Sequence, residues 1–453
     1  MRYARGFVLI SLLFTLACQG ETPTPTLTAT VEILPTFTPT PPPTILPPTF
    51  PPLDITSTPE LGNIYYVSPN GSDANSGLTE AQAWQTLAKV NEMAFQPGDV
   101  VRFERDGSWS GGLVVDVSGE QGRPIVFTSY GDGFLPVISN PGNETNFTSA
   151  IRVTGQWVVM DGLKVSDAQD AGVYVQASHV VVQNVEAENV GIGVKVNGAN
   201  NLITRNYIHD LHMVKNTPGG TDDYGAIGIA FGNASFNEAS YNRIAKCIAP
   251  SYDFGTDGGV FEFFGATDNN YIHHNWGSDS NGFLEVGGGS AVDTILAYNV
   301  SVNNGGFTSI HLTDAWASEV RNFRVENNTI VETGAPGWML IKFAGDPTVE
   351  MFVLRNNIIY VGDFQGVANK AGFTHTNNLF LLIGQTKLGF ALGADEKIGD
   401  PLFVNLPRRD FRLQPESPAI DAGLSLGYLF DFIHLSVPSG PAPDLGAFEF
   451  QLP

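Results

Sequence analysis

Two glutamates, Glu262 and Glu285, occur at matching positions of neighbouring repeat segments. On adjacent strands their carboxylates would lie about 5 to 5.5 Å apart, the spacing at which retaining glycosidases hold a nucleophile and an acid/base. Like-charge proximity would raise the pKa of one of them, as a general acid requires. The pair therefore predicts glycoside hydrolysis, and the sequence leaves open which glutamate is the nucleophile.

Other polar residues near this pair extend the predicted site. Asp257 is expected at the turn that leads into the Glu262 strand and could replace either glutamate. A separation of about 6.5 to 9.5 Å between Asp257 and Glu285 would indicate an inverting enzyme. His311 could hydrogen-bond Glu285 or a sugar hydroxyl. Lys195 and Lys342 belong to the same series of positions, and we predict that they bind substrate.

The series is a column of outward-facing residues on stacked strands. Side chains alternate along a strand, so an apolar second residue in each segment points inward and the first residue points outward. The predicted inward set is Val153, Val175, Val196, Ala230, Phe263, Val286, Leu312 and Phe343. The predicted outward column is Arg152, Tyr174, Lys195, Ile229, Glu262, Glu285, His311 and Lys342. Directly opposed like charges destabilise a sheet, so two adjacent glutamates need a shared proton, a cation or a function.

An internal repeat must position this column. An asparagine recurs every 21 to 36 residues, and the shortest spacings indicate a coil of about 22 residues with three short strands. Such a repeat is typical of a parallel β-helix, an all-β solenoid. The asparagines would stack as an amide ladder at a tight turn, which is a structural role. They are Asn206, Asn242, Asn275, Asn299, Asn328, Asn357 and Asn378, with Asn184 and Asp161 extending the series backward.

The two ends of the repeat region support this fold. It begins with residues 64–73, an expected helix from Thr79 to Met93, and residues 97–103; it ends with residues 399–403, 417–423 and 443–447. These segments resemble the entry and closing segments of right-handed parallel β-helix proteins of the pectate-lyase-like superfamily. The resemblance spans about residues 64 to 453 and implies a helix that caps the open end of the solenoid. The superfamily hosts lyases, glycosidases, epimerases and non-enzymatic modules, so the fold alone does not choose an activity.

Two alternatives to hydrolysis follow. The first is a polysaccharide lyase or epimerase, in which the resemblance implies Ca²⁺ on the carboxylates, with Asp253 and Asp257 as candidate ligands and Lys195 or Lys342 as base. Against it, the predicted column has no cation directly beside the glutamate pair, and a chain of net charge −23 repels a polyuronate unless a metal reverses the local field. The second is a non-catalytic carbohydrate-binding or adhesin-like module. Hydrolysis requires no cofactor.

The longest loops precede the Ile229 and Glu262 strands and are expected to form one wall of a groove. They span residues 215–223 and 249–259. Aromatic residues predicted to stack on sugars are Tyr224, Tyr252, Phe254, Trp276 and Trp316. His209, His212, Asp222 and Asp223 could bind a metal, but they match no compact metal-ligand spacing and are interpreted as loop residues.

The N-terminal region indicates export and tethering. Residues 1–17 read as a signal peptide that ends before Cys18, a candidate lipidation site. Residues 18–60 follow as a tether, in which residues 21–60 hold 12 prolines and 12 threonines and form an extended spacer. The solenoid with its cap is predicted over 61–390 and its closing segment over 391–453. We expect a monomer, anchored by lipid at the outside of a bacterial cell.

Composition excludes several classes of function. Charged residues make up only 15% of the chain and glycines number 50, which favours β-structure over a helical bundle. The acidic balance, 46 Asp and Glu against 23 Lys and Arg, argues against nucleic acid as a partner. The expected partner is a polysaccharide or oligosaccharide. Cys247 is predicted to be a buried thiol without a disulfide.

Overall fold

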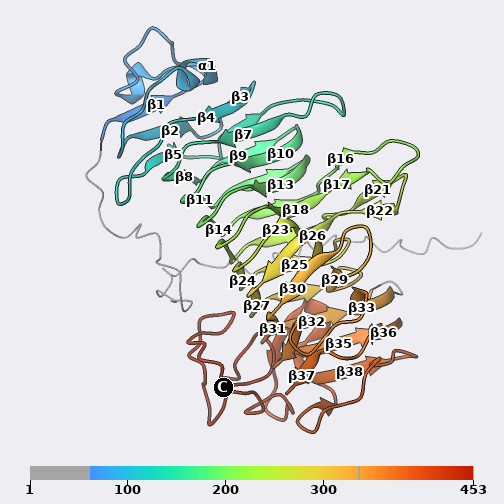
Figure 1. The fold of residues 1–453 in the computed structure, drawn as a ribbon. Helices are drawn as coiled ribbons and strands as arrows, with labels where there is room; N and C mark the ends of the chain where they lie inside the picture. The colour runs from blue at the N-terminus through green and yellow to red at the C-terminus, as the bar shows by residue number, and fades with distance from the viewer. Residues whose placement is uncertain (1–61, 335–336, 452–453) are drawn as a thin grey trace, which may run out of the picture. The chain divides into compact units, whose positions relative to one another are not determined.

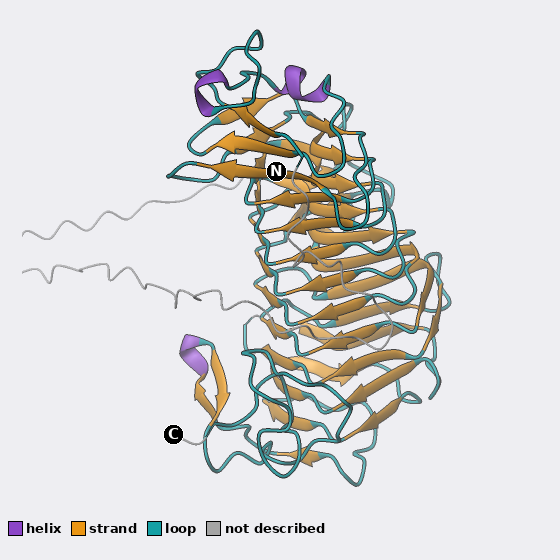
Figure 2. Ribbon diagram, turned by 90° about the vertical axis from the view of Figure 1, so that its left-hand side faces the viewer, coloured by secondary structure: helices purple, strands orange, loops and turns teal. Residues whose placement is uncertain are grey.

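The computed structural model describes residues 62–334 and 337–451 as stacked coils that build three parallel sheets (Figures 1 and 2). Sheet A contains β1 (Ile64–Val67), β2 (Val100–Glu104), β5 (Ile125–Tyr130), β8 (Val158–Asp161), β11 (Val180–Gln183), β14 (Leu202–Thr204), β19 (Glu238–Ser240), β24 (Tyr271–His273), β27 (Ile295–Ala297), β31 (Phe323–Glu326), β34 (Phe352–Arg355) and β37 (Thr374–Thr376).

Sheets B and C contribute the other two strands of each coil. Sheet B contains β3 (Ser108–Ser110), β6 (Val137–Ser139), β9 (Lys164–Ser166), β12 (Glu186–Glu188), β15 (Tyr207–His209), β20 (Arg243–Ala245), β25 (Trp276–Ser278), β28 (Val300–Val302), β32 (Thr329–Glu332), β35 (Ile358–Gly362), β38 (Leu379–Ile383) and β39 (Lys397–Ile398). Sheet C contains β4 (Leu113–Val115), β7 (Ser149–Val153), β10 (Ala168–Val175), β13 (Val190–Val196), β18 (Ile227–Gly232), β23 (Gly259–Ala266), β26 (Leu284–Val292), β29 (Thr308–His311), β33 (Gly337–Ala344) and β36 (Phe364–Ala368), with β30 (Ser318–Arg321) paired to β26.

Apolar rows fill the interior between the sheets. On sheet C one row is formed by Val153, Val175, Val196, Phe231, Phe263, Val286, Ile310 and Phe343, each buried. Stacked coils make each row continuous, so one truncation such as Phe263→Ala removes contacts with two neighbouring coils. Such a change typically costs about 3 to 5 kcal/mol.

The predicted asparagine ladder is present at the turn between sheets A and B. Each side-chain amide from Asn206 to Asn357 donates to the amide oxygen of the next asparagine, over 2.9 to 3.0 Å. The left-handed turn residue is the one just before each ladder asparagine, for example Arg205 with φ of 56°. Asn184 and Asp161 were expected to extend the ladder, but Asn184 lies one position too early and Asp161 two positions too early. Asn184 itself takes the left-handed turn, and its amide donates to Asp161 outside the core.

The N-terminal cap holds less helix than expected. Instead of one helix from Thr79 to Met93, the structure has the 3-10 turn η1 (Glu80–Gln82) and the short α1 (Leu87–Asn91). Trp84 interrupts them because its backbone forms a parallel bridge with Val67 and its ring is 1% exposed in the core. The Thr86 side chain then accepts a hydrogen bond from the Lys89 amide and begins α1.

The C-terminal residues pack on the outside of sheet B. They include the antiparallel pair β40 (Phe403–Asn405) and β41 (Asp410–Leu413), joined by the 3-10 turn η2 (Leu406–Arg408). Phe403, Phe411 and Leu413 form an apolar cluster with Val300, Val331 and other residues of β28, β32, β35 and β38. Arg409 forms a bidentate ion pair with Asp279, in which its two terminal guanidinium nitrogens donate to the carboxylate oxygens at 2.8 and 2.7 Å.

The predictions for the cysteines and for the N-terminal region have different outcomes. Cys247 is free and fully buried, and burial raises the pKa of its thiol to about 12, as expected for an inert structural cysteine. The signal peptide, Cys18 and the tether lie outside the described residues. Within residues 62–334 and 337–451, no helix has the length and apolarity needed to cross a membrane.

Candidate active site on sheet C

A groove lies on the outer face of sheet C, over strands β13 to β33. Two adjoining cavities of about 590 and 260 Å³ share Glu262, Glu285, Ser309 and Lys342 in their linings. The larger cavity is bounded by two hairpins inserted into the coils. They are β16 (Met213–Lys215) with β17 (Tyr224–Gly225), and β21 (Ala249–Ser251) with β22 (Gly255–Asp257). The expected loop wall is therefore in place beside the glutamates.

The register of sheet C corrects the predicted column at two positions. The outward column is Arg152, Tyr174, Lys195, Ala230, Glu262, Glu285, Ser309 and Lys342. Ile229 is 0% exposed and points into the core. The predicted register of β18 is wrong by one residue, which exchanges the inward and outward side chains. At β29 the predicted register is wrong by two residues, and a shift of two residues leaves the same side chains outward. His311 therefore still faces out, two residues beyond Ser309.

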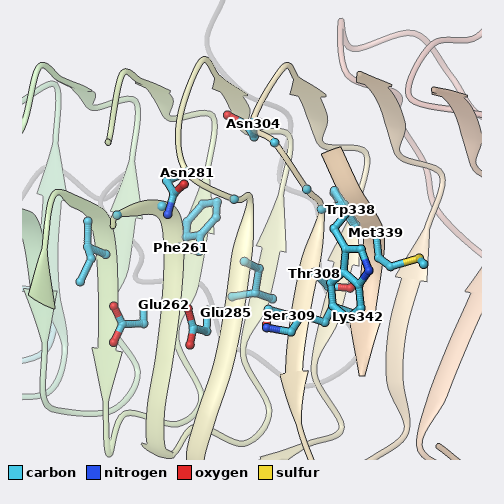
Figure 3. A pocket seen from close by; sticks show the side chains of 18 residues that line it. Phe261, Glu262, Asn281, Glu285, Asn304, Thr308, Ser309, Trp338, Met339 and Lys342 are labelled. Atoms are coloured by element: carbon cyan, nitrogen blue, oxygen red, sulfur yellow. The ribbon is translucent and has the colours of Figure 1, made fainter. Parts of the chain in front are cut away.

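Glu262 and Glu285 are direct neighbours across β23 and β26, as the sequence predicts. Figure 3 shows both carboxylates pointing to the same side of the sheet from adjacent strands. Burial, together with the charges of Glu285 and Asp257, raises the pKa of Glu262 to about 8. Glu285 is more open, with 49% of its side chain exposed. At neutral pH the pair therefore holds a proton on Glu262.

Asp257 supplies a third carboxylate from the end of β22. It lines the larger cavity and accepts a hydrogen bond from the Gly258 amide at 2.7 Å. Burial raises its pKa to about 6, with a further contribution from the charge of Glu285. The hairpin thus brings an acidic group to the groove beside the pair on the sheet.

His311 links Glu285 to a fourth carboxylate. Its Nε2 lies 3.1 Å from Glu285 Oε1, and its Nδ1 lies 2.5 Å from Asp314 Oδ2. The hydrogen bond with Glu285 raises the pKa of His311 although burial opposes the rise. Asp314 was missed by the site prediction, although it is only three residues beyond His311 in the same segment. Trp316 packs edge-on against the imidazole, with ring centroids 5.7 Å apart.

The two lysines differ in their surroundings. Lys195 is bound to Asp170 through distances of 2.9 and 3.2 Å, and Asp170 raises the lysine pKa against the effect of burial. Lys342 is the register partner of Ser309, and its Nζ lies 5.9 Å from the Trp338 ring centroid. Lys342 lines both cavities, and unlike Lys195 it has no carboxylate within ion-pair distance of its ammonium among the described residues.

The aromatic predictions divide into three groups. Tyr224, Phe254 and Trp316 line the larger cavity. Tyr252 is 66% exposed near the tip of the β21–β22 hairpin and lies outside both linings. Trp276 lies on β25 in sheet B, where its ring stacks on Phe411 with centroids 5.8 Å apart. The expected place of Trp276 in the groove is wrong, because the strand after each ladder asparagine belongs to sheet B.

Four groove residues that carry neither a carboxylate nor a cationic side chain were missed. Phe264, Asn281, Ser309 and Trp338 line one cavity or both. Ser309 and Phe264 could have been found from a correct register, since each has the same orientation as the glutamates. Asn281 and Trp338 lie outside the repeated strand positions from which the column was predicted, so the repeat did not point to them.

Asp253 and Asp257, the two predicted calcium ligands, have different surroundings: Asp257 lines the larger cavity and Asp253 belongs to an acidic cluster. Asp253 groups with Asp222 and Asp223, at the contact of the two hairpins. There Asp253 Oδ2 accepts hydrogen bonds from the amides of Asp222 and Asp223, at 2.9 and 3.2 Å. Oxygen clusters of this kind suit Ca²⁺, but these oxygens already join the hairpins to each other.

Comparison with known proteins agrees with this fold. Residues 149–275 match the family model described as "Right handed beta helix region". Over 441 residues the chain is 24% identical to pectate lyase L of Dickeya chrysanthemi, covering 87% of this chain and 92% of that protein. The solved structure of pectate lyase Pel9A is similar, with 19% identity, a TM-score of 0.60, and coverage of 87% of this chain and 98% of that one. The solved structure of the GH136 lacto-N-biosidase from Eubacterium ramulus is also similar. Its sequence identity is 15% and its TM-score is 0.53, and the match covers 74% of this chain and 68% of that one.

Proposed function

We propose that this chain, a right-handed parallel β-helix of the pectate-lyase-like superfamily, is a carbohydrate-active enzyme that hydrolyses glycosidic bonds with Glu262 and Glu285. The observation that carries the proposal is the register pairing of the two glutamates in a groove where one has a raised pKa. Pairs of carboxyl groups whose environments separate their pKa values are typical of an acid and its partner base or nucleophile.

The two roles follow from the surroundings of each glutamate. Glu262, with a pKa of about 8, carries the proton at neutral pH and is the general acid. Glu285 lies within hydrogen-bond distance of His311, which orients its carboxylate, and is the nucleophile. Neighbouring strands lie about 4.8 Å apart, close to the 5 to 5.5 Å of retaining glycosidases.

The reaction then has two balanced steps. Glu262 gives its proton to the glycosidic oxygen while Glu285 attacks the anomeric carbon, so the leaving sugar departs as an alcohol and a glycosyl ester forms on Glu285. Glu262, now a carboxylate, takes a proton from a water molecule that attacks the same carbon. This releases the sugar with its configuration retained and regenerates both glutamates.

A second candidate is a polysaccharide lyase. It is supported by the 24% identity with pectate lyase L over most of the chain and by Lys342 in the groove, where it could abstract a proton. The carboxylates of the groove, Asp257 among them, could hold Ca²⁺, which would neutralise a uronate substrate. Neither lysine of the column is a direct neighbour of the pair, because the Ala230 strand separates Lys195 from Glu262 and the Ser309 strand separates Lys342 from Glu285, which favours hydrolysis.

One experiment separates the two candidates. The purified chain is incubated with a panel of neutral and acidic polysaccharides, with and without a chelator, while reducing ends and unsaturated-uronate absorbance are followed together. Hydrolysis predicts reducing ends without absorbance, unaffected by chelator and lost in Glu262→Gln and Glu285→Gln. Absorbance that disappears with chelator and with Lys342→Met would instead establish a lyase.

We also propose that the enzyme works outside the cell, attached through a lipid on Cys18. The proposal rests on the sequence of residues 1–60. Mass spectrometry of the N-terminal peptide from membranes tests it: a mature chain that begins with an acylated Cys18 is expected, and an unmodified Cys18 would contradict it.

A further inference from the structure

A second cluster of ionisable groups lies on the outer face of sheet B, apart from the groove of sheet C. Glu186 and Glu188 project from β12, and His209 projects from β15 on the next coil, where it is the register partner of Glu188. Ala187 and Ile208, between them on the two strands, are 0% exposed and point into the core. The three polar side chains therefore share one outward face and bridge two coils.

His209 presents a buried nitrogen to the two carboxylates. Its Nε2 lies 3.8 Å from Glu186 Oε1 and 3.7 Å from Glu188 Oε2, too far for a hydrogen bond. The residue is 9% exposed, and the Nε2 atom is buried with no hydrogen-bond partner among the described residues. A buried polar atom without a partner is costly and requires an explanation.

The contact of the other imidazole nitrogen determines the tautomer of a neutral His209 ring. Its Nδ1 lies 2.7 Å from Asp210 Oδ2, and the second oxygen of Asp210 accepts from Lys246 at 3.0 Å. An ionised carboxylate only accepts hydrogen bonds, so Nδ1 donates and Nε2 keeps its lone pair in the neutral ring. A carboxylate that orients a histidine in this way is the usual second layer of a metal site. Tyr207 stacks on the ring, with centroids 4.1 Å apart, and holds its orientation.

The distances fit one metal ion. Zinc binds histidine nitrogen and carboxylate oxygen at about 2.0 to 2.2 Å, so two ligand atoms of one ion lie at most about 4.4 Å apart. Both distances from His209 Nε2 are within this limit, and one ligand atom from each residue can be chosen with all three within 4.8 Å of one another. An imidazole ligand favours zinc or another late transition metal over Ca²⁺ and Mg²⁺.

We propose that Glu186, Glu188 and His209 form a binding site for a divalent transition-metal ion such as Zn²⁺, which clips two coils together on sheet B. The side chains of Glu186 and Glu188 are 30% and 36% exposed, so an ion can enter from solvent. Lys164 contacts Glu186 Oε1 at 2.6 Å and Glu188 Oε1 at 2.8 Å. Its ammonium competes with the ion for Glu186 Oε1 and lowers the affinity of the site.

Calorimetric titration of the full chain, purified without a histidine tag, with ZnCl₂ tests the site. One saturable site with a Kd on the order of micromolar is expected. Glu188→Gln and His209→Gln should weaken binding at least tenfold, and Asp210→Asn about tenfold, by loss of the orienting hydrogen bond. Lys164→Met should tighten binding. Asp222→Asn, in the acidic cluster of the hairpins, is the matched control and should leave the Kd unchanged.

Glu188→Gln keeps the test decisive even if His209→Gln fails to fold, because Glu188 is partly exposed on the surface. The absence of a saturable site, or the same Kd in wild type and Glu188→Gln, would overturn the proposal. A thermal unfolding scan supplies a second readout: Zn²⁺ should raise the Tm of the wild type and leave that of Glu188→Gln unchanged.

Discussion

Two pairs of glutamates on the outside of one solenoid differ in what neutralises them. On sheet B, Glu186 and Glu188 lie along one strand, and Lys164 contacts both. On sheet C, Glu262 and Glu285 lie side by side on adjacent strands. Ala230 and Ser309 are the next residues of the column on either side of the pair. Without a cation between them, the pair on sheet C accommodates its charges by holding a proton. The neighbouring side chains therefore decide whether an acidic pair forms ion pairs or holds a proton.

The largest expected difference between the two pairs is catalytic. Glu285→Gln should lower kcat/KM on the order of 10³-fold or more by removing the nucleophile. Glu262→Gln should lower it about 10² to 10⁴-fold by removing the general acid. Release of reducing ends from the substrate found in the polysaccharide panel measures both. Glu186→Gln and Glu188→Gln are the matched controls, and their kcat/KM should stay within about twofold of wild type. Losses equal to those on sheet C would contradict the assignment of catalysis to the sheet C pair.

Stability should depend on pH at Glu262. Because folding raises its pKa to about 8, Glu262 stabilises the fold fully below the unfolded pKa of about 4.3, and this contribution is lost as pH rises through 8. Glu262→Gln should therefore be about 4 to 5 kcal/mol more stable than wild type at pH 9, relative to their difference at pH 4. Urea unfolding at both pH values measures this. A difference between the two proteins that does not change with pH would contradict the raised pKa.

Placing a lysine next to Glu262 should make sheet C resemble sheet B. Ala230 is the register partner of Glu262, so in Ala230→Lys an ammonium would favour the ionised carboxylate and lower its pKa. Activity at pH 7 should fall about 10 to 100-fold and recover in part at lower pH, as measured by the pH profile of kcat/KM. Ala230→Met adds similar bulk without charge, and its pH optimum should match wild type. An unchanged profile in Ala230→Lys would remove Glu262 from the role of acid.

The smallest effect is expected for removing the cation from sheet B. Lys164→Met leaves Glu186 and Glu188 unneutralised, but both are partly exposed and screened by solvent. We expect a loss of about 1 kcal/mol or less at pH 7, and none at pH 3, where the carboxylates are protonated. Urea unfolding at the two pH values measures it. A loss several times larger would mean that the ion pair holds the coils together.

The sequence was sufficient for the fold and for the centre of the groove. The recurrent asparagines predicted the coils because an amide ladder requires one asparagine per turn, and the alternation of side chains placed Glu262 beside Glu285. It failed where strands lacked a clear end. The predicted column placed Ile229 beside Glu262, but the residue that pairs with Glu262 is Ala230. Asp314 was missed because a loop brings it to His311, and no strand periodicity predicts a loop conformation.

The metal cluster of sheet B was beyond the sequence argument for a related reason. His209 and Glu188 are 21 residues apart, and neither belongs to a compact metal motif. Only the stacking of β12 and β15 brings the three ligand atoms together. Trp276 shows the same limit, since its sheet could be assigned only once the turn after each ladder asparagine was known.

Direct titration of Glu262 tests the central claim that this residue is a neutral carboxylic acid in the groove at neutral pH. In protein labelled with ¹³C at the glutamate carboxyl carbons, NMR spectra of wild type and Glu262→Gln across pH identify the resonance of this residue. We predict a midpoint near pH 8, as burial and the two neighbouring carboxylates require. A midpoint near the ordinary value of about 4.3 would contradict the account, because Glu262 would then have no proton to donate at neutral pH.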